Sequence, residues 1–307
     1  RVDKMGRGSW ARTMRGMEFL NKHGVEFNTL TCVQRHNGSK PLEVYRFLRE
    51  AGSGFMQFIP IIERKLEGDG TSFREDGLTL VTPEAGDAPR LCPWSVEPLQ
   101  YGKFLSAIFD EWVRRDVGQV FVQIFDIALE AWIGREPSLC VFREVCGDGM
   151  ALEHNGDLYS CDHYVYPEHR LGNLMEHPIG DLANCEQQRR FGLAKQDGLP
   201  EYCCSCDMHF MCHGECPKHR FLKTPDGEPG LNYLCEGYKH FFHHIDPYMQ
   251  FMARELMAQR PPANVMAYAR QRDLEASGKA EPSPNDLCPC GSGRKFKKCC
   301  GRKNANA

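Results

Sequence analysis

The sequence lacks the features that would place a chain in a membrane or on nucleic acid. No apolar run approaches the roughly 18–20 residues of a spanning helix, and no signal-peptide pattern opens it. Its 307 residues carry a net charge of only −3, so no strong overall field draws it to nucleic acid or anionic lipid. With 41% hydrophobic and 26% charged residues, we expect a globular protein of the cytoplasm, without a membrane partner.

Cysteine, in contrast, is abundant. The chain has 16 cysteines, and all but Cys32 and Cys92 lie from Cys140 onward. Disulfide frameworks are typical of secreted domains shorter than about 100 residues, and this chain is neither short nor marked for export. A metal protein is therefore the better expectation, with its chemistry concentrated in the second half of the chain.

Helical and extended patterns alternate near the start of the chain. An amphipathic pattern predicts a helix over 9–22, and β-branched residues predict a strand over 25–33. The same pair follows at once, with a helix over 41–52 and a buried strand over 55–62. Units that repeat after about 30 residues predict an α/β fold with a parallel sheet.

The rest of the chain divides by composition. Residues 63–95 are rich in Gly, Asp and Pro, which predicts a loop or insertion. Residues 140–235 are predicted to be loop-rich and to need metal for part of their folding energy. Further helices are expected over 101–114, up to 132 and over 236–275, with a short strand over 120–124 and a polar linker over 276–287.

The cysteines of the second half form two spaced groups. The first is C-x5-C-x14-C, and the second is C-x2-C-x5-C-x3-C with a further cysteine 19 residues on. Their members are Cys140, Cys146 and Cys161, then Cys203, Cys206, Cys212, Cys216 and Cys235. Thiolates suit both zinc and iron–sulfur clusters, and the uneven spacing favours clusters over the paired C-x2-C motifs of zinc ribbons.

This cysteine pattern resembles the SPASM domain of radical S-adenosylmethionine (SAM) enzymes. The strings GDLYSCDHYVYPEHRLGNL (156–174) and LNYLCEGYKHFF (231–242) resemble anaerobic sulfatase-maturating enzymes in particular, as does the segment that starts the chain. The resemblance implies the C-terminal part of a partial (β/α)6 radical SAM barrel over 1–136 and a SPASM domain over 137–245. A helical tail and linker would follow over 246–285.

The resemblance also implies two 4Fe–4S clusters, each held by four cysteines. One would take Cys140, Cys146, Cys161 and Cys216, and the other would take Cys203, Cys206, Cys212 and Cys235. The remaining cysteines of the first 287 residues are expected to be bystanders: Cys32, Cys92, Cys185 and Cys204.

Four further residues gain roles from the same resemblance. Asp162, next to a ligand cysteine, would be the general base that deprotonates a substrate Cys or Ser. Arg1 would contact the carboxylate of SAM. Gln57 and Ile59, near the end of a predicted strand, stand where barrel strands present cofactor-binding residues. Without the resemblance, a turn aspartate, a solvated arginine and core strand residues would be the ordinary interpretations.

One motif of radical SAM enzymes is missing. No C-x3-C-x2-C, which holds the catalytic cluster, occurs in the sequence, and the chain begins with Arg1 instead of Met. We therefore expect a fragment or processed product whose first barrel units, with a third cluster, lie outside this sequence. We expect the chain as it stands not to cleave SAM.

The last residues form a separate basic module over 286–302. Two close cysteine pairs, Cys288 with Cys290 and Cys299 with Cys300, flank a Gly-Ser-Gly turn and suit tetrahedral zinc. The string GSGRKFKKCC resembles the SEC-C motif. Its lysines and arginines predict either a solvated charged face or a docking site for a protein or ribosomal RNA.

The favoured function is that of a sulfatase-maturating oxidoreductase. It would oxidise a Cys or Ser of a sulfatase to Cα-formylglycine, with electrons exchanged with a donor such as flavodoxin or ferredoxin. Two alternatives stay open at this point: another peptide-modifying SPASM enzyme, or a non-catalytic adaptor with zinc in all three sites.

Overall fold

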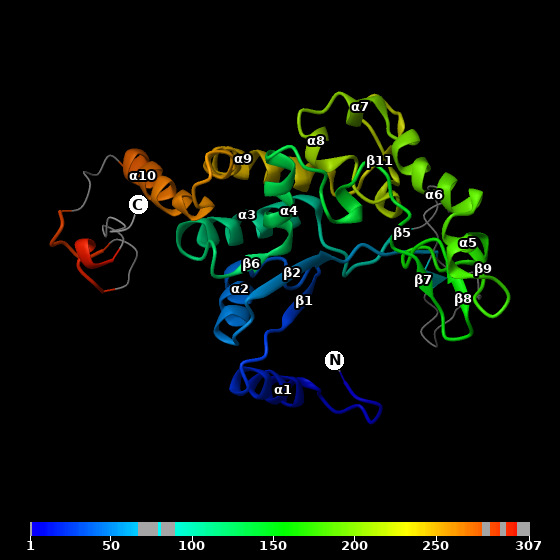
Figure 1. The fold of residues 1–307 in the computed structure, drawn as a ribbon, viewed down its shortest axis with the longest axis horizontal. Coiled ribbons are helices and arrows are strands. Elements are labelled where there is room, and N and C mark those ends of the chain that lie inside the picture. Colours follow the sequence, from blue (N-terminus) through cyan, green and yellow to red (C-terminus); the bar gives the residue numbers. More distant parts are fainter. Residues whose placement is uncertain (1, 67–78, 81–89, 278–282, 289–292, 300–307) are drawn as a thin grey trace.

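The structure is a computed structural model, and it describes residues 2–66, 79–80, 90–277, 283–288 and 293–299. A parallel sheet of three strands lies at its centre (Figure 1), in the order β1 (Asn28–Val33), β2 (Phe55–Pro60) and β6 (Phe121–Val122). The register pairs Asn28 with Phe55 and Phe55 with Phe121. The predicted α/β alternation and parallel pairing are confirmed.

Helices α2 (Pro41–Glu50), α3 (Pro98–Arg115), α4 (Gln123–Trp132), α9 (Cys235–Met257) and α10 (Val265–Ser277) accompany this sheet. Their shared core is apolar and contains many aromatic rings. The ring of Phe109 on α3 is fully buried, with centroids 5.1 Å from Phe125, 5.6 Å from Trp112 and 5.7 Å from Tyr248. Aromatic rings in such offset and edge contacts contribute beyond the area that they bury.

Helices α3 and α9 touch through their backbones. A Cβ atom on Gly102 of α3 would collide with the carbonyl oxygen of Gly237 on α9, and one on Gly237 would collide with that of Pro98. Both positions therefore require glycine, and α9 is held against α3 two residues after its first residue, Cys235.

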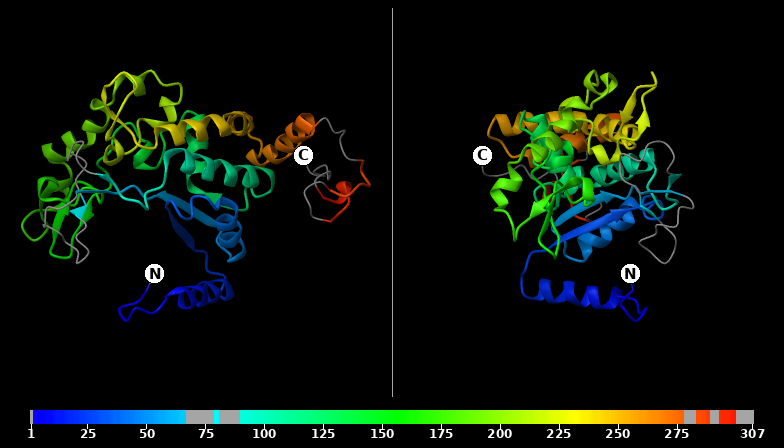
Figure 2. Two further views of the ribbon diagram at one scale, coloured as in Figure 1. Left: turned by 180° about the vertical axis from the view of Figure 1, so that it is seen from behind. Right: turned by 90° about the vertical axis from the view of Figure 1, so that its right-hand side faces the viewer.

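Helix α1 (Trp10–Lys22) confirms the predicted helix but contributes no buried residue. Its apolar side chains stay largely open, with Trp10 63% and Phe19 54% exposed. It is attached near α2, where the Trp10 and Phe47 rings lie 5.3 Å apart and Asn21 donates to the Ala51 carbonyl at 2.8 Å. Figures 1 and 2 show α1 standing apart from the sheet on a single connection.

The prediction of a loop over 63–95 was wrong in part. The segment contains the short strands β3 (Arg64–Leu66), β4 (Thr79–Leu80) and β5 (Arg90–Leu91), which form an antiparallel sheet in the order β4-β3-β5. Such short pairings depend on backbone hydrogen bonds between distant residues, so local composition does not reveal them.

The cysteine-rich region is built from short elements, as expected, except for the 12-residue helix α6. A small antiparallel sheet orders its strands β7-β8-β9 and a hairpin joins β10 to β11. The elements are η1 (Cys140–Phe142), β7 (Ala151–Leu152), β8 (Asp157–Tyr159), η2 (Pro167–His169), β9 (Arg170–Asn173), α5 (Ile179–Ala183), α6 (Glu186–Asp197), α7 (Glu201–Cys204), α8 (His209–Cys212), η3 (Pro217–His219), β10 (Leu222–Lys223) and β11 (Pro229–Leu231).

Two further short helices lie near the C-terminal end, η4 (Pro262–Asn264) before α10 and η5 (Phe296–Lys298) in the basic module. Among the described helices, none combines the length and the apolar character needed to cross a membrane.

Candidate metal centre and active site

A cavity of about 370 Å³ opens between the end of the parallel sheet and the cysteine-rich region. Gln57 and Ile59 of β2 line one side, and Asp162 lines the other. Four cysteines complete the wall: Cys140, Cys146, Cys161 and Cys216. The structure thus brings together, around one space, the described cofactor and base candidates and the first predicted cysteine set.

The first set is assembled from four separate segments. Cys140 begins η1, Cys146 follows it, Cys161 follows β8, and Cys216 precedes η3. The sulfurs lie near enough to interact electrostatically, Cys140 with both Cys146 and Cys161, and Cys161 with Cys216. All four are free thiols. Burial raises the pKa of Cys161 to about 12, so the thiols hold their protons until a metal displaces them.

The second set lines a separate, narrower cavity. Cys203 lies on α7, Cys206 follows it, Cys212 ends α8, and Cys235 begins α9. Burial, with Cys235 as the next contributor, raises the pKa of Cys203 to about 11 and that of Cys212 to about 12. Cys204, the expected bystander, is exposed and does not line this cavity. Four thiols around one space are a donor set that fits a thiolate-ligated cluster.

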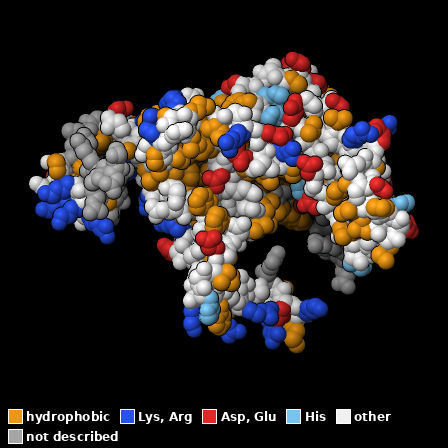
Figure 3. All heavy atoms as spheres, in the orientation of Figure 1, with side chains coloured by type: hydrophobic (Ala, Val, Ile, Leu, Met, Phe, Trp, Pro, Cys, Tyr) orange, Lys and Arg blue, Asp and Glu red, His pale blue; other side chains and the backbone are white. Residues whose placement is uncertain are grey.

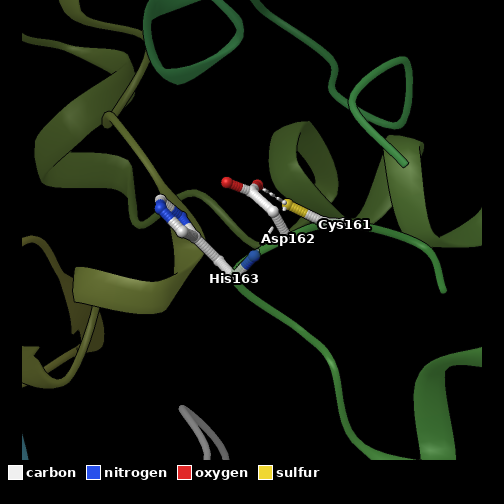
Figure 4. Close-up of side chains that lie close together, drawn as sticks. All are labelled: Cys161, Asp162 and His163. Atoms are coloured by element: carbon white, nitrogen blue, oxygen red, sulfur yellow. Dashed lines mark hydrogen bonds between the residues drawn. The ribbon is translucent and has the colours of Figure 1, made fainter. Parts of the chain in front are cut away.

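Asp162 stands at the edge of the first set with its carboxylate exposed. The Cys161 Sγ donates to Asp162 Oδ1 at 3.2 Å, and the backbone N–H of His163 donates to Cys161 Sγ at 3.4 Å (Figure 4). Ligand atoms of the three consecutive residues lie within 4.8 Å of one another. An accessible carboxylate beside a candidate centre is well placed to receive a proton from a bound substrate.

His163 is a contact that the sequence interpretation missed. Its Nδ1 lies 3.4 Å from Cys216 Sγ, and burial lowers the pKa of the imidazole. A sulfur that ligates a metal has no proton to give, so Nδ1 would then be the donor of this hydrogen bond. The signal available in the sequence was only its place two residues after a ligand candidate.

A buried polar group behind the cavity was also missed. Glu215 is 2% exposed, and its carboxylate accepts hydrogen bonds from Asn232 Nδ2 at 2.6 Å and lies 3.0 Å from His219 Nδ1. Although burial opposes ionisation, the neighbouring His219 and these hydrogen bonds hold the pKa of Glu215 below its ordinary value. The group fixes the segment that carries Cys216.

The remaining candidates lie at the two ends of the chain. Cys288 is 4% exposed and its N–H donates to the Arg294 carbonyl at 2.7 Å, while the N–H of Cys299 donates to the Phe296 carbonyl at 3.0 Å. Cys290, Cys300 and Arg1 lie outside the described residues. The described lysines and arginines of this module are exposed and form a basic surface (Figure 3): Arg294, Lys295, Lys297 and Lys298.

Comparison with known proteins supports the site. A family profile described as an iron–sulfur cluster-binding domain, SPASM, matches residues 140–207, and the SEC-C motif matches 285–302. The serine-type anaerobic sulfatase-maturating enzyme of Bacteroides thetaiotaomicron is 45% identical over 275 residues, which are 90% of this chain and 65% of that enzyme. The chain is a relative of the anaerobic sulfatase-maturating enzymes. The resemblance predicted from the sequence is confirmed.

More distant members agree. The cysteine-type enzyme of Clostridium perfringens is 28% identical over 80% of this chain and 61% of its own length. A solved structure described as native anSMEcpe with bound AdoMet and Cp18Cys peptide matches with a TM-score of 0.68 and 27% identity, over 83% of this chain and 65% of that one. The chain therefore spans less than two thirds of the length of these relatives.

Proposed function

We propose that this chain is part of a radical SAM oxidoreductase that converts a Ser or Cys side chain of a sulfatase to Cα-formylglycine. The observation that carries the proposal is the shared cavity, in which Asp162, Gln57 and Ile59 face the first cysteine set. The relatives named as serine-type and cysteine-type anaerobic sulfatase-maturating enzymes support it.

The donor groups divide among the cofactors as the resemblance implies. The first cysteine set would hold one 4Fe–4S cluster and the second set another, since each offers four free thiols around one cavity. Gln57, Ile59 and Arg1 would bind SAM, with a third cluster in the preceding barrel units. Cys288, Cys290, Cys299 and Cys300 would bind zinc.

The parallel strands β1, β2 and β6 would belong to a partial (β/α)6 barrel over 1–136. The SPASM domain would occupy 137–245, the tail and linker 246–285 and the zinc module 286–302. Flavodoxin or ferredoxin would exchange electrons with the clusters, in the cytoplasm. The basic surface of the zinc module would dock on a protein in preference to ribosomal RNA.

The residues of the cavity would divide the reaction between them. When bound, SAM supplies a radical that removes a hydrogen atom from the substrate Cβ, and a cluster supplies a one-electron acceptor. Asp162 would accept the proton of the substrate hydroxyl or thiol. A Ser side chain that loses a hydrogen atom, this proton and one electron has become the aldehyde. A Cys side chain becomes a thioaldehyde, which water then hydrolyses to the same aldehyde with release of hydrogen sulfide, so the atoms and electrons balance.

Metal content after anaerobic reconstitution tests the cofactors. We expect about eight iron and one zinc per chain, whereas about three zinc and no iron would establish the adaptor alternative. Formation of a thioether crosslink in a sulfatase peptide, in place of formylglycine, would establish another peptide-modifying activity.

Asp162→Asn tests the base in the whole enzyme that contains this chain. We expect D162N to lower formylglycine formation about 10²–10⁴-fold, measured by peptide mass, with iron content unchanged. Asp207→Asn is the matched control because Asp207 also follows a ligand candidate, with its carboxylate 3.7 Å from Cys206 Sγ. Equal losses in D162N and D207N would contradict the assignment.

A further inference from the structure

A buried lysine lies against the first cysteine set without a carboxylate partner. Lys195 of α6 is 1% exposed, and its Nζ donates to the carbonyl oxygens of Cys140 at 2.8 Å, Val141 at 3.0 Å and Arg143. Three acceptors require three N–H donors, which only the ammonium form has. A buried ammonium ordinarily needs a negative partner, because desolvation of the charge is expensive.

A second cation holds the turn that links the two cysteine sets. Between Cys212 of the second set and Cys216 of the first lie three residues, all with left-handed backbone: His213 at φ 44°, Gly214 at 69° and Glu215 at 52°. This conformation turns their three carbonyl oxygens toward the guanidinium of Arg220. The guanidinium donates hydrogen bonds to the carbonyl oxygens of His213 at 2.9 Å, Gly214 at 2.9 Å and Glu215 at 3.0 Å.

The guanidinium also ties this turn to α6. Arg220 Nη1 donates to the carbonyl oxygen of Lys195 at 2.5 Å. A Cβ atom on Gly214 would lie 2.8 Å from Arg220 Nη2, so glycine is required for the guanidinium to approach. The guanidinium of Arg220 thus donates all these hydrogen bonds to neutral backbone carbonyls. Within the described chain, neither Arg220 nor Lys195 forms an ion pair with a carboxylate.

The groups that could supply negative charge to the two cations are mainly cysteines. Cys146 and Cys216 face Lys195, while Cys203, Cys212 and Cys216 face Arg220. Glu215 faces both, but its carboxylate is already bound to His219 and Asn232. The sulfurs are neutral as thiols, and as metal-bound thiolates they would supply the missing negative charge.

We propose that Lys195 and Arg220 are the buried counter-charges of the two cysteine-ligated centres, Lys195 for the first centre alone and Arg220 for both. The inference rests on the proposed function, because it takes the two centres to be 4Fe–4S clusters. Four thiolates leave such a cluster net negative, and reduction adds one more electron. A cation in the low-dielectric interior favours the reduced form and raises the reduction potential.

Potentiometric titration followed by electron paramagnetic resonance tests this assignment in the reconstituted chain. Signals are assigned first in C212A and C216A, which each leave one intact cysteine set. For Lys195→Met, we expect the reduced-to-oxidised ratio of the first centre at a fixed potential to fall about tenfold, or about 59 mV for one electron, with the second centre unchanged. For Arg220→Gln, we expect both centres to shift in the same direction.

Controls separate charge from structure. Lys195→Arg and Arg220→Lys keep the charge, and we expect their potentials to stay near those of the parent chain. Arg190→Gln removes an exposed cation of the same helix, 78% exposed, and should shift neither centre because water screens it. If K195M or R220Q loses iron, recovery of iron in K195R or R220K supports the charge role, and loss in both members of a pair overturns it.

The outcomes distinguish this inference from the function on which it rests. Full iron loading with unchanged potentials in K195M and R220Q overturns the counter-charge assignment and leaves the proposed cofactors in place. Zinc in place of iron in the parent chain overturns the proposed function itself, before any variant is compared.

Discussion

The two halves of this molecule differ in how many polar side chains lie in their interiors. Around α3, α4 and α9 most buried side chains are apolar and many are aromatic, as the environment of Phe109 shows, and the buried Glu111 is paired with Arg46. Between Cys140 and Cys235 the buried set includes many polar and ionisable groups: Ser160, Gln188, Lys195, Glu215, His219 and Asn232. Apolar burial stabilises the first interior, whereas we expect the second to depend more on hydrogen bonds and on the proposed metal ligation.

The largest expected effect comes from removing one cysteine from either cysteine set. In C216A and C212A we expect each chain to lose the iron of one centre and keep the other, so that iron per chain falls by about half. Cys204→Ala should retain all the iron, because Cys204 is exposed and outside both sets. Iron and sulfide analysis measures this, and complete loss in both variants would mean that the two sets do not form independently.

Metal removal should also separate the halves by hydrogen exchange. We expect the amides of the cysteine-rich region to lose protection in the metal-free chain while those of α3 and α4 remain protected. Uniform loss of protection across both regions would show that the two halves do not differ in their dependence on metal.

A smaller effect is expected when a side chain of the apolar interior is truncated. Phe109→Ala should lower the free energy of unfolding by about 3–5 kcal/mol, since it removes a fully buried ring. Phe210→Ala is the control in the cysteine-rich half, where the ring is 43% exposed. Denaturant titration measures both, and iron content should stay constant in F109A. An equally large loss in F210A would contradict the contrast between the interiors.

The smallest effect concerns a charge within the apolar half. Burial, with a lesser contribution from Glu130, raises the pKa of Asp126 on α4 to about 7. In the unfolded chain this carboxyl titrates near pH 4, so the folded chain binds the proton more tightly. Stability therefore declines as the pH rises from about 4 to 7, and no further above that window.

Asp126→Asn removes this penalty. We expect D126N to raise the free energy of unfolding at pH 8 by on the order of 2 kcal/mol and to leave it nearly unchanged at pH 4. Denaturation at the two pH values measures the difference. Destabilisation of D126N at pH 8 would contradict the assignment, because it would show that the Asp126 carboxylate makes favourable contacts in the folded chain.

The sequence was sufficient where local patterns decide the structure. Periodicity located β1, β2 and α2 and indicated parallel pairing, because hydrophobic spacing reports which face is buried. The grouping of Cys216 with the distant Cys140 came from the family resemblance, and the structure places both on one cavity. Spacing alone left zinc and iron–sulfur ligation open.

What the sequence could not reveal depends on long-range contacts. From the sequence alone Lys195 and Arg220 resemble ordinary surface cations. Lys195 binds carbonyls more than 50 residues away, and Arg220 binds a turn whose left-handed backbone is not evident from the sequence. The pairing of β3 with β4 and β5 is hidden for the same reason. Helix α1 differs from these cases because the sequence correctly predicts an amphipathic helix, but the described part of the chain buries none of its residues.

The backbone contact of Gly102 with Gly237 couples the packing of the apolar half to the position of a cysteine in the other half. Any side chain at either glycine would part α9 from α3 and carry the first residue of α9, Cys235, with it. A substitution at Gly102, in the apolar half, would therefore also displace a cysteine of the second set.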